Sequence, residues 1–268
     1  MRYALKFAYD GTQFDGYARQ PDFYTTEGHI IWAMKKQKII ISPEEAKFAS
    51  SSRTDKGVSA VGNVLAINTD FQKDAIIKAL NPILEGVIFY GIAEVPDDYN
   101  PRHARQRTYR YILLKNQCPE ISKLKNAAEL FLGEQDFKYF SKTDDRHEIT
   151  RLKLDSIELI EDGQYIIVEI KAHRFLWQLV RRLVSFMLAV ANGEVSEEKV
   201  KEMLDGSVQI LASPKPMPPE NLLLMNVKFK FEFEELAGEG YSFEALQNKA
   251  ILRAGVMGQI IKLLEEEE

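Results

Sequence analysis

The stretch SSRTDKGVSA, Ser51 to Ala60, places an arginine, an aspartate and a lysine within four residues, between two apolar runs. Asp-Lys-Gly is a common turn composition, and on its own it favours a structural turn. A carboxylate on a rigid turn also projects into a cleft, where it is a competent nucleophile if it stays ionised and desolvated. Asp55 is therefore a candidate nucleophile, and its neighbours Arg53 and Lys56 are candidate nucleic-acid contacts.

Arg181 is a second candidate, in a segment 175–192 that begins FLWQLVRRLV. The apolar residues of this segment cover most of a helix circumference, which predicts a buried helix. A buried guanidinium without a carboxylate partner is very costly, so we expect Arg181 to have an acidic partner. The pair is either a structural ion pair or, if the partner is Asp55, part of a site that keeps the aspartate ionised.

Tyr109 is the third candidate, within RTYRY at residues 107–111. An extended chain puts Tyr109 and Tyr111 on one face of a strand and Arg110 on the other. Strand tyrosines are most often core residues. A ring beside arginines also stacks on a nucleobase while the cations hold phosphates, so a nucleic-acid contact is the alternative.

The charge is unevenly spread along the 268 residues, although the formal net charge is -5. PRHARQRTYR, residues 101–110, holds four arginines and a histidine without an acid, and AHRFLWQLVRR adds three arginines. Phosphate binding needs only a local basic patch, so the net charge does not exclude nucleic acid. A solvated arginine face is the alternative interpretation.

Several classes of protein are disfavoured. The single cysteine, Cys118, excludes an internal disulfide and a Cys-rich zinc site, and the four histidines are scattered, so we expect no metal. Neither GxGxxG nor GxxxxGK[ST] occurs, which argues against a dinucleotide or nucleoside triphosphate cofactor. No run approaches the roughly 20 apolar residues of a membrane helix. The N-terminus does not resemble a signal peptide, so we expect a cytoplasmic protein.

The sequence pattern predicts a mixture of strands and helices. The expected strands span residues 3–9, 38–41, 61–68, 87–95, 108–114, 152–160, 165–170 and 225–233. The expected helices span residues 29–36 with a threonine cap, 74–80, 121–131, 175–192, 197–204 and 243–264. Strict strand–helix–strand alternation is absent, which favours an α+β protein with a mostly antiparallel sheet.

Five motifs occur together in one order: YDGTQFDGY, RTDKGVSA, RTYRY, FLGEQDFKYF and FLWQLVRRLV. This combination resembles the tRNA pseudouridine synthase A family, and the matches extend from about residue 3 to residue 230. The resemblance implies two α+β lobes, residues 1–104 and 105–268, with antiparallel sheets joined into one continuous sheet and an active-site cleft between the lobes. It also implies a homodimer that acts on uridines near positions 38 to 40 of tRNA without metal or cofactor.

The same resemblance implies roles for individual residues. Asp55 corresponds to the catalytic aspartate, Tyr109 to the tyrosine that packs on the target base, and Arg181 to the arginine that pairs with the aspartate. Arg53 corresponds to the residue that enters the RNA stem as the base leaves it. The residues expected to contact RNA are Arg53, Lys56, Arg102, Arg107 and Arg110.

The sequence departs from the bacterial pattern at several positions. Ser59 replaces the histidine of GVHA, Ser52 and Asn221 replace glycines, and Tyr17-Ala18 stands where Trp-Gln is usual. These features look more like the archaeal and eukaryotic branch, and they leave open other or broader tRNA positions for the same chemistry.

Two other functions remain as alternatives. A non-catalytic RNA-binding protein with RRM-like lobes would bind without changing a base, but the chain lacks an RNP1-like pattern. A hydrolase with an aspartate nucleophile would release free uracil, and it usually needs a second carboxylate within about 5–10 Å.

Overall fold

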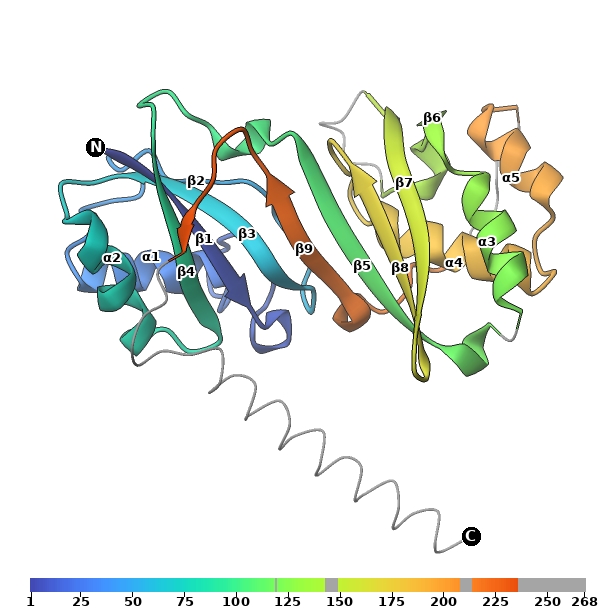
Figure 1. Cartoon of the computed structure of the whole chain (residues 1–268), viewed down its shortest axis with the longest axis horizontal. Coiled ribbons are helices and arrows are strands. Elements are labelled where there is room, and N and C mark those ends of the chain that lie inside the picture. Colours follow the sequence, from blue (N-terminus) through green and yellow to red (C-terminus); the bar gives the residue numbers. More distant parts are fainter. Residues whose placement is uncertain (119, 143–148, 208–213, 236–268) are drawn as a thin grey trace, which may run out of the picture.

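The computed structural model describes residues 1–118, 120–142, 149–207 and 214–235. These residues form one ten-stranded sheet with the order β10-β4-β1-β3-β9-β5-β8-β7-β6, and β2 pairs with β3 beside this path. Every pairing is antiparallel except that of β3 with β9. Figure 1 shows this sheet running along the length of the molecule, flanked by helices. The predicted α+β class with one continuous, mainly antiparallel sheet is confirmed.

The half of the sheet that contains the N-terminus is built around β1 (Arg2–Tyr9), in which every residue except Lys6 is buried. Its alternating apolar residues predict one buried face, and in the structure residues on both faces are buried. β3 and β4 pair with its two edges, so β1 is an interior strand. The other elements of this half are β2 (Ala49–Ser50), β3 (Ser59–Asn68), β4 (Val87–Val95), α1 (Thr26–Lys36) and α2 (Lys73–Leu80). The Thr25 side chain caps α1 by accepting the backbone N–H of Gly28, as predicted.

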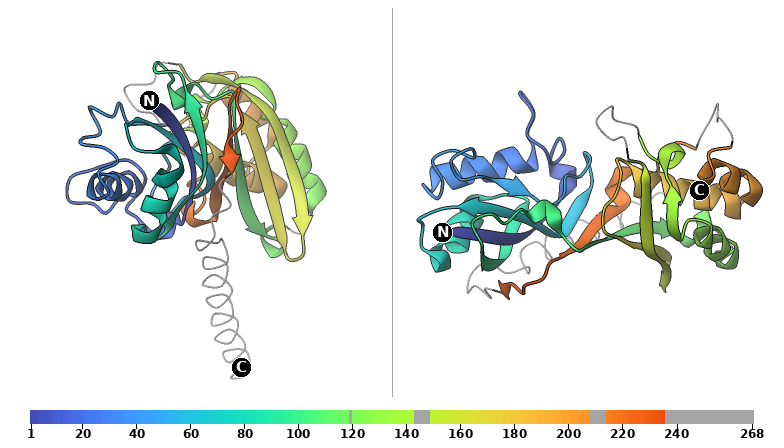
Figure 2. Two further views of the ribbon diagram at one scale, coloured as in Figure 1. Left: turned by 60° about the vertical axis from the view of Figure 1, so that its left-hand side comes forward. Right: turned by 90° about the horizontal axis from the view of Figure 1, so that it is seen from above.

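The other half of the sheet contains a long hairpin that turns at Gly163, where φ is +54°. Its strands are β5 (Gln106–Leu114), β6 (Gly133–Asp136), β7 (Arg151–Asp162) and β8 (Tyr165–Ala172). Its helices are α3 (Ile121–Glu129), α4 (Leu179–Ala191) and α5 (Glu197–Leu204). Figure 2 shows α1 and α4 on the same side of the sheet, so loops from both halves meet on that side.

The two halves are joined by β9 (Leu222–Lys228), which pairs parallel with β3 and antiparallel with β5. The chain then returns to the first half, where β10 (Glu234–Glu235) pairs with β4. A division after residue 104 therefore leaves β10 in the sequence of one lobe and the sheet of the other. The division after residue 104 therefore stays a proposal about how the sequence is divided into lobes, because the sheet itself is continuous.

Two of the predicted strands differ from the structure. Residues 38–41 form a turn after α1, because Lys38 adopts a φ of +58° and the chain reverses. The strand expected at 225–233 is β9 and ends at Lys228. Beyond it, Phe229 stacks on Phe231 and Phe233 packs edge-to-face on both while the chain crosses to β4. The helix expected over 243–264 lies outside the described residues.

The helix expected from residue 175 begins only at Leu179, because Gln178 has a φ of +60°. The structure also contains short 3-10 helices at Gly11–Gln13, Asn81–Ile83, Pro101–His103, Lys115–Gln117, Lys138–Phe140 and Pro219–Asn221.

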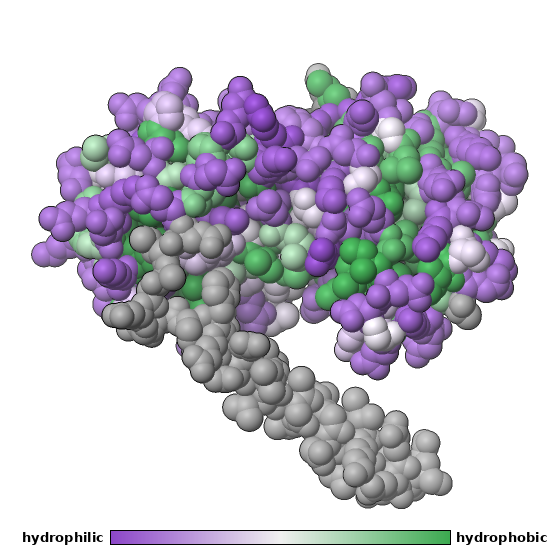
Figure 3. Space-filling view, in the orientation of Figure 1, coloured by the Kyte–Doolittle hydropathy of each residue, from purple (hydrophilic) through white to green (hydrophobic). Residues whose placement is uncertain are grey.

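The face of the sheet turned away from α1 and α4 is open in the half that contains β5, β7 and β8 (Figure 3). Apolar side chains on this face are partly exposed: Ile112, Leu114, Ile160 and Tyr165. No helix in the described residues is long and apolar enough to cross a membrane.

Candidate active site

The turn that carries Asp55 connects β2 to β3 and is held by the end of β1. The backbone N–H of Val58 donates to the Asp55 carbonyl at 3.2 Å, and Gly57 supplies the positive φ of +89° that closes the turn. A side chain at Gly11 is excluded, since its Cβ would lie 2.0 Å from the Val58 carbonyl oxygen. The hydroxyls of Tyr9 and Thr54 are also hydrogen-bonded at 2.8 Å. These contacts hold the turn in one position, as a residue of a catalytic site requires.

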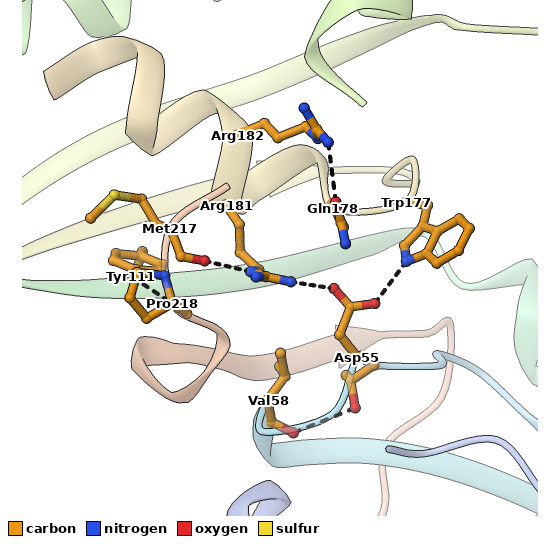
Figure 4. Close-up of polar contacts among 10 residues, drawn as sticks. Asp55, Val58, Tyr111, Trp177, Gln178, Arg181, Arg182, Met217 and Pro218 are labelled. Atoms are coloured by element: carbon orange, nitrogen blue, oxygen red, sulfur yellow. Dashed lines mark hydrogen bonds and ion pairs between the residues drawn. The ribbon is translucent and has the colours of Figure 1, made fainter. Parts of the chain in front are cut away.

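Two donors hold the Asp55 carboxylate, one on each oxygen (Figure 4). Nη1 of Arg181 lies 2.8 Å from Oδ2, and Nε1 of Trp177 lies 2.9 Å from Oδ1. Nε of Arg181 donates to the Met217 carbonyl at 2.6 Å, which fixes the guanidinium from the other side. The prediction that Arg181 is buried beside an acidic partner is confirmed, and that partner is Asp55.

The start of α4 explains how Trp177 and Arg181 both reach Asp55. The left-handed Gln178 separates the last loop residue, Trp177, from the first helical turn. A non-glycine residue in this conformation is uncommon and is held by its surroundings. The loop can therefore aim the indole at one carboxylate oxygen while the helix aims Arg181 at the other.

A cavity of about 440 Å³ opens beside this carboxylate. Its walls combine the polar groups of the site with apolar side chains from the Asp55 turn, β5, β9 and α4. The lining residues are Arg53, Thr54, Asp55, Val58, Tyr109, Phe175, Leu176, Trp177, Gln178, Leu179, Val180, Arg181 and Leu222. Asp55 is the one carboxylate among these described lining residues, so the wall offers no second acid of the kind that glycosidases use.

Tyr109 forms part of the cavity wall and is 8% exposed. Its ring packs edge-to-face on Phe175, with 4.9 Å between the ring centroids. Burial raises the pKa of the Tyr109 phenol to about 12, with Arg107 opposing the shift and Asp55 adding to it. Tyr109 is therefore a neutral hydroxyl at physiological pH, close to an ionised site.

Arg107, which we expected along the RNA path, lies in the interior of the protein, and its contact with RNA stays a prediction. The side chain shares the buried face of β5 with Tyr109, and the residue is only 8% exposed. Its guanidinium donates to the carbonyls of Ser51, Arg102 and His173 and to the Ser52 hydroxyl, at 2.6 to 3.1 Å. Burial lowers the pKa of this guanidinium. Arg107 connects four segments around the site.

The other basic candidates are distributed differently. Arg53 lines the cavity and is exposed, and Arg102 is exposed on the connection between the halves. Lys56 is exposed and bonds Asp15 at 2.7 Å. Arg110 lies on the opposite face of β5 and bonds Glu169 at 2.6 Å, so the structure does not bring it to the cavity. The expected contact of Arg110 with RNA stays a prediction.

Trp177 is the site residue that sequence reasoning missed. Its indole is one of the two donors to Asp55, yet the sequence counted it only as part of an apolar helix. The sequence held one signal for this role: Trp177 precedes Arg181 by four residues, and its indole N–H is a hydrogen-bond donor. Within the described residues, no group of three or more histidines, cysteines or acids is arranged to hold a metal ion.

Comparison with known proteins places the chain in a family. Residues 127–230 match the family model described as tRNA pseudouridine synthase. Proteins named tRNA pseudouridine synthase A are 40% identical to it in Pyrococcus furiosus and 34% in Methanothermobacter thermautotrophicus. The first alignment covers 99% of this chain and 97% of the relative, and the second covers 98% and 89%. The Thermococcus sibiricus protein of the same name is 41% identical over 92% of this chain and 93% of its own length.

The similarity is thus not confined to the active-site motifs but extends through both halves of the sheet. The chain belongs to the tRNA pseudouridine synthase A family.

Proposed function

We propose that this pseudouridine synthase converts uridine to pseudouridine in the anticodon stem-loop of tRNA, near positions 38 to 40, with Asp55 as the reacting carboxylate. The observation that carries the proposal is the environment of Asp55, which two donors hold at the wall of a cavity of about 440 Å³. The tRNA and the type of reaction follow from the family. The role of Asp55 and the positions modified in the tRNA go beyond family membership and are what we propose.

The target base has to leave its stack before it reaches Asp55, at a cost of a few kcal/mol. The aromatic and aliphatic wall formed by Tyr109, Phe175 and Leu179 offers the base an apolar surface in place of its neighbours. Arg53 lines the same cavity and is exposed, which supports the proposal that its side chain occupies the gap left in the RNA.

The reaction is an isomerisation, in which the bond from ribose C1′ to uracil N1 breaks and a bond from C1′ to C5 forms. The C5 hydrogen leaves as a proton and N1 gains one, so no oxidant, reductant or added group is needed. Asp55 begins cleavage by one of three routes: attack on C1′, addition to uracil C6, or removal of the C2′ proton. All three need an ionised, accessible carboxylate.

The contacts around Asp55 suit this requirement. Arg181 and Trp177 orient the carboxylate by charge-assisted hydrogen bonds, with one donor at each oxygen. Each carboxylate oxygen has a further lone pair, so both stay able to act on the substrate. Tyr109 stays protonated, because burial raises the pKa of its phenol to about 12, and it packs beside the base as a neutral group.

Tritium release from tRNA labelled at uracil C5 tests the reaction and the role of Asp55 together. We expect release by the wild type and none by Asp55→Asn, with both proteins binding tRNA. Asp155→Asn is the matched control: it removes an exposed carboxylate that bonds Gln106 and does not line the cavity. Release equal to wild type by Asp55→Asn would overturn the assignment of the carboxylate.

The products separate the alternatives. Free uracil would identify a hydrolase, and tight binding without any tritium release would identify a binding protein. Transcripts in which uridines 38, 39 and 40 are replaced one at a time by cytidine test the positions. Continued release from a transcript with all three replaced would show that the chemistry acts elsewhere.

The family resemblance also implies a homodimer. Sedimentation of the full chain tests this separately, with a mass of one chain as the contradicting result.

A further inference from the structure

A row of aromatic rings connects the loop after β1 to α1, outside the cavity described above. The row consists of Phe14, Tyr24, His29 and Trp32, with 5.2, 5.2 and 5.4 Å between successive ring centroids. His29 and Trp32 are nearly parallel, at 8° between their planes. Lys36, one turn further along α1, places its ammonium 4.8 Å from the Trp32 centroid.

The row is buried at one end and open at the other. Phe14 is 3% exposed, whereas Tyr24 and Trp32 are about half exposed, at 51% and 47%, and the adjacent Phe23 is 57% exposed. A hollow of about 400 Å³ lies among them, lined by Phe23, Tyr24, Thr25, Gly28, His29 and Trp32. Three large aromatic side chains left in water around one hollow are typical of a binding site.

The row is tied to the turn that carries Asp55. The backbone N–H of Tyr24 donates to Oδ2 of Asp15 at 3.3 Å, and the Tyr24 carbonyl accepts the N–H of Asp15 at 2.8 Å. The other oxygen of Asp15 bonds Lys56, the residue after Asp55, at 2.7 Å. Figure 2 shows the blue loop before α1 rising on the side of the sheet that α4 covers. An RNA whose target base lies in the cavity brings its flanking nucleotides to this side.

The aromatic lining of the hollow favours a base over a phosphate. Burial lowers the pKa of His29, so its ring is uncharged at physiological pH and stacks as a neutral aromatic. Charged residues of both signs lie nearby: the backbone N–H of Glu85 donates to Nε2 of His29, and Lys36 places its ammonium over the Trp32 ring. These charges do not select a phosphate, whereas every nucleobase has a π face that stacks on aromatic side chains.

We propose that this hollow binds an unpaired nucleobase of the tRNA substrate, one other than the target uridine, by stacking on Phe23, Tyr24 and Trp32. The inference rests on the proposed function for the identity of the RNA. The hollow would provide a second contact, which holds the flanking nucleotides while Asp55 acts on the target uridine. Stacking involves no phosphate, so removing a stacked ring should not change the salt dependence of tRNA binding.

Affinity for a tRNA transcript, measured over a series of salt concentrations, tests the proposal. Trp32→Ala and Phe23→Ala should each weaken binding by about 5- to 150-fold at every salt concentration, the range for loss of one base stack. The slope of log affinity against log salt should stay unchanged, because no phosphate contact is lost. Trp32→Phe should recover part of the loss, since it keeps a ring.

Two controls mark the other outcomes. Tyr165→Ala removes a ring that is 40% exposed on the open face of the sheet, away from α1, and should leave the affinity unchanged. Arg102→Ala removes an exposed cation and should reduce the salt slope by about one unit if it contacts a phosphate. A reduced slope for Trp32→Ala or Phe23→Ala, or an unchanged affinity for both, would overturn the stacking proposal.

Fluorescence gives an independent readout, because Trp32 and Trp177 are the two tryptophans of the chain. In a Trp177→Phe protein, tRNA binding should quench the remaining emission from Trp32. Bound tRNA without quenching would contradict the proposal even if Trp32→Ala failed to fold. If the wild type releases tritium but neither affinity nor emission responds, the stacking site fails and the proposed function stands. Absence of tritium release from the wild type would instead refute the function.

Discussion

Arg181 and Arg107 contact opposite ends of the segment Ser51–Asp55, and both are almost excluded from solvent, at 9% and 8% exposure. Arg181 bonds one carboxylate and one carbonyl. Arg107 bonds three carbonyls and one hydroxyl. The first guanidinium is compensated by an opposite charge, and the second by oriented dipoles.

This difference separates two uses of a buried cation. The ion pair at Arg181 orients and stabilises a group that has to react, so its loss should appear mainly in the rate. The dipoles around Arg107 belong to the residue after β8, the connection between the halves and the segment before Asp55. Its loss should therefore appear mainly in stability. Substituting the two arginines in the same way tests whether the distinction holds.

The largest effect is expected for Arg181→Met, which keeps the length of the side chain but removes both hydrogen bonds. Loss of one preorganised donor costs about 10²- to 10³-fold in kcat, and we expect a fall of that order in tritium release. Arg182→Met is the control, since it removes a neighbouring charge on α4 whose guanidinium bonds Gln178. Equal losses in both variants would show that general charge, not the contact with Asp55, is responsible.

Arg107→Met should lower the free energy of unfolding by about 2–4 kcal/mol, because it leaves several buried carbonyls without their charged donor. The folded fraction should retain a kcat within about tenfold of the wild type. Denaturant unfolding measures the first quantity and tritium release the second. Arg110→Met, on the opposite face of the same strand, removes one partner of Glu169, which keeps Lys171 at 2.8 Å. Because Arg110 is partly exposed and Glu169 stays paired, about 0–1 kcal/mol is expected for this variant. If it is as destabilising as Arg107→Met, burial is not the cause.

Trp177→Phe keeps an aromatic ring and removes the second donor to Asp55. A hydrogen bond to a charged group contributes about 1.5–3 kcal/mol, so we expect kcat to fall by about 10- to 100-fold. The double variant with Arg181→Met should lose less than the sum of the two single effects, because both donors act through one carboxylate. Full additivity in the measured ΔΔG‡ would contradict a shared target.

The smallest effect on activity is expected from ionisation of Tyr109. Burial raises the pKa of its phenol to about 12, above the unfolded value of about 10, so the rate should not fall below pH 10 through this group. Its contribution to stability is fully present below pH 10 and is lost as the pH rises through 12. The free energy of unfolding, measured from pH 9 to 12, should therefore fall less steeply with pH in Tyr109→Phe than in the wild type. Identical slopes would show that this phenol does not determine the alkaline loss.

Buried charge proved the most informative signal in the sequence. The apolar circumference of residues 175–192 required an acidic partner for Arg181, and the structure provides Asp55, 126 positions earlier in the chain. Periodicity also placed Tyr109 on a buried face and Arg110 on the opposite one. The same period of two assigns Arg107 to the face of Tyr109, so its burial was available from the pattern that was used for its neighbours.

Other features depended on conformations that the pattern does not encode. The indole of Trp177 reaches Asp55 from a loop, because Gln178 adopts a positive φ that glutamine seldom takes. The alternation over residues 225–233 is real, but the ladder ends at Lys228 where the chain crosses between the halves. In both places the three-dimensional path overrides a local preference, and only the assembled sheet determines it.

The position of β9 has a consequence for how the protein is made. The strand that joins the two halves of the sheet is among the last described segments in the chain, whereas its parallel partner β3 ends at Asn68. Contacts that span so many residues close large loops and form slowly. The loop that carries Met217, which fixes Arg181, also comes from this late segment. A nascent chain therefore cannot assemble the complete Asp55 site until Met217 and β9 have left the ribosome, so catalytic competence appears late in synthesis relative to the Asp55 turn.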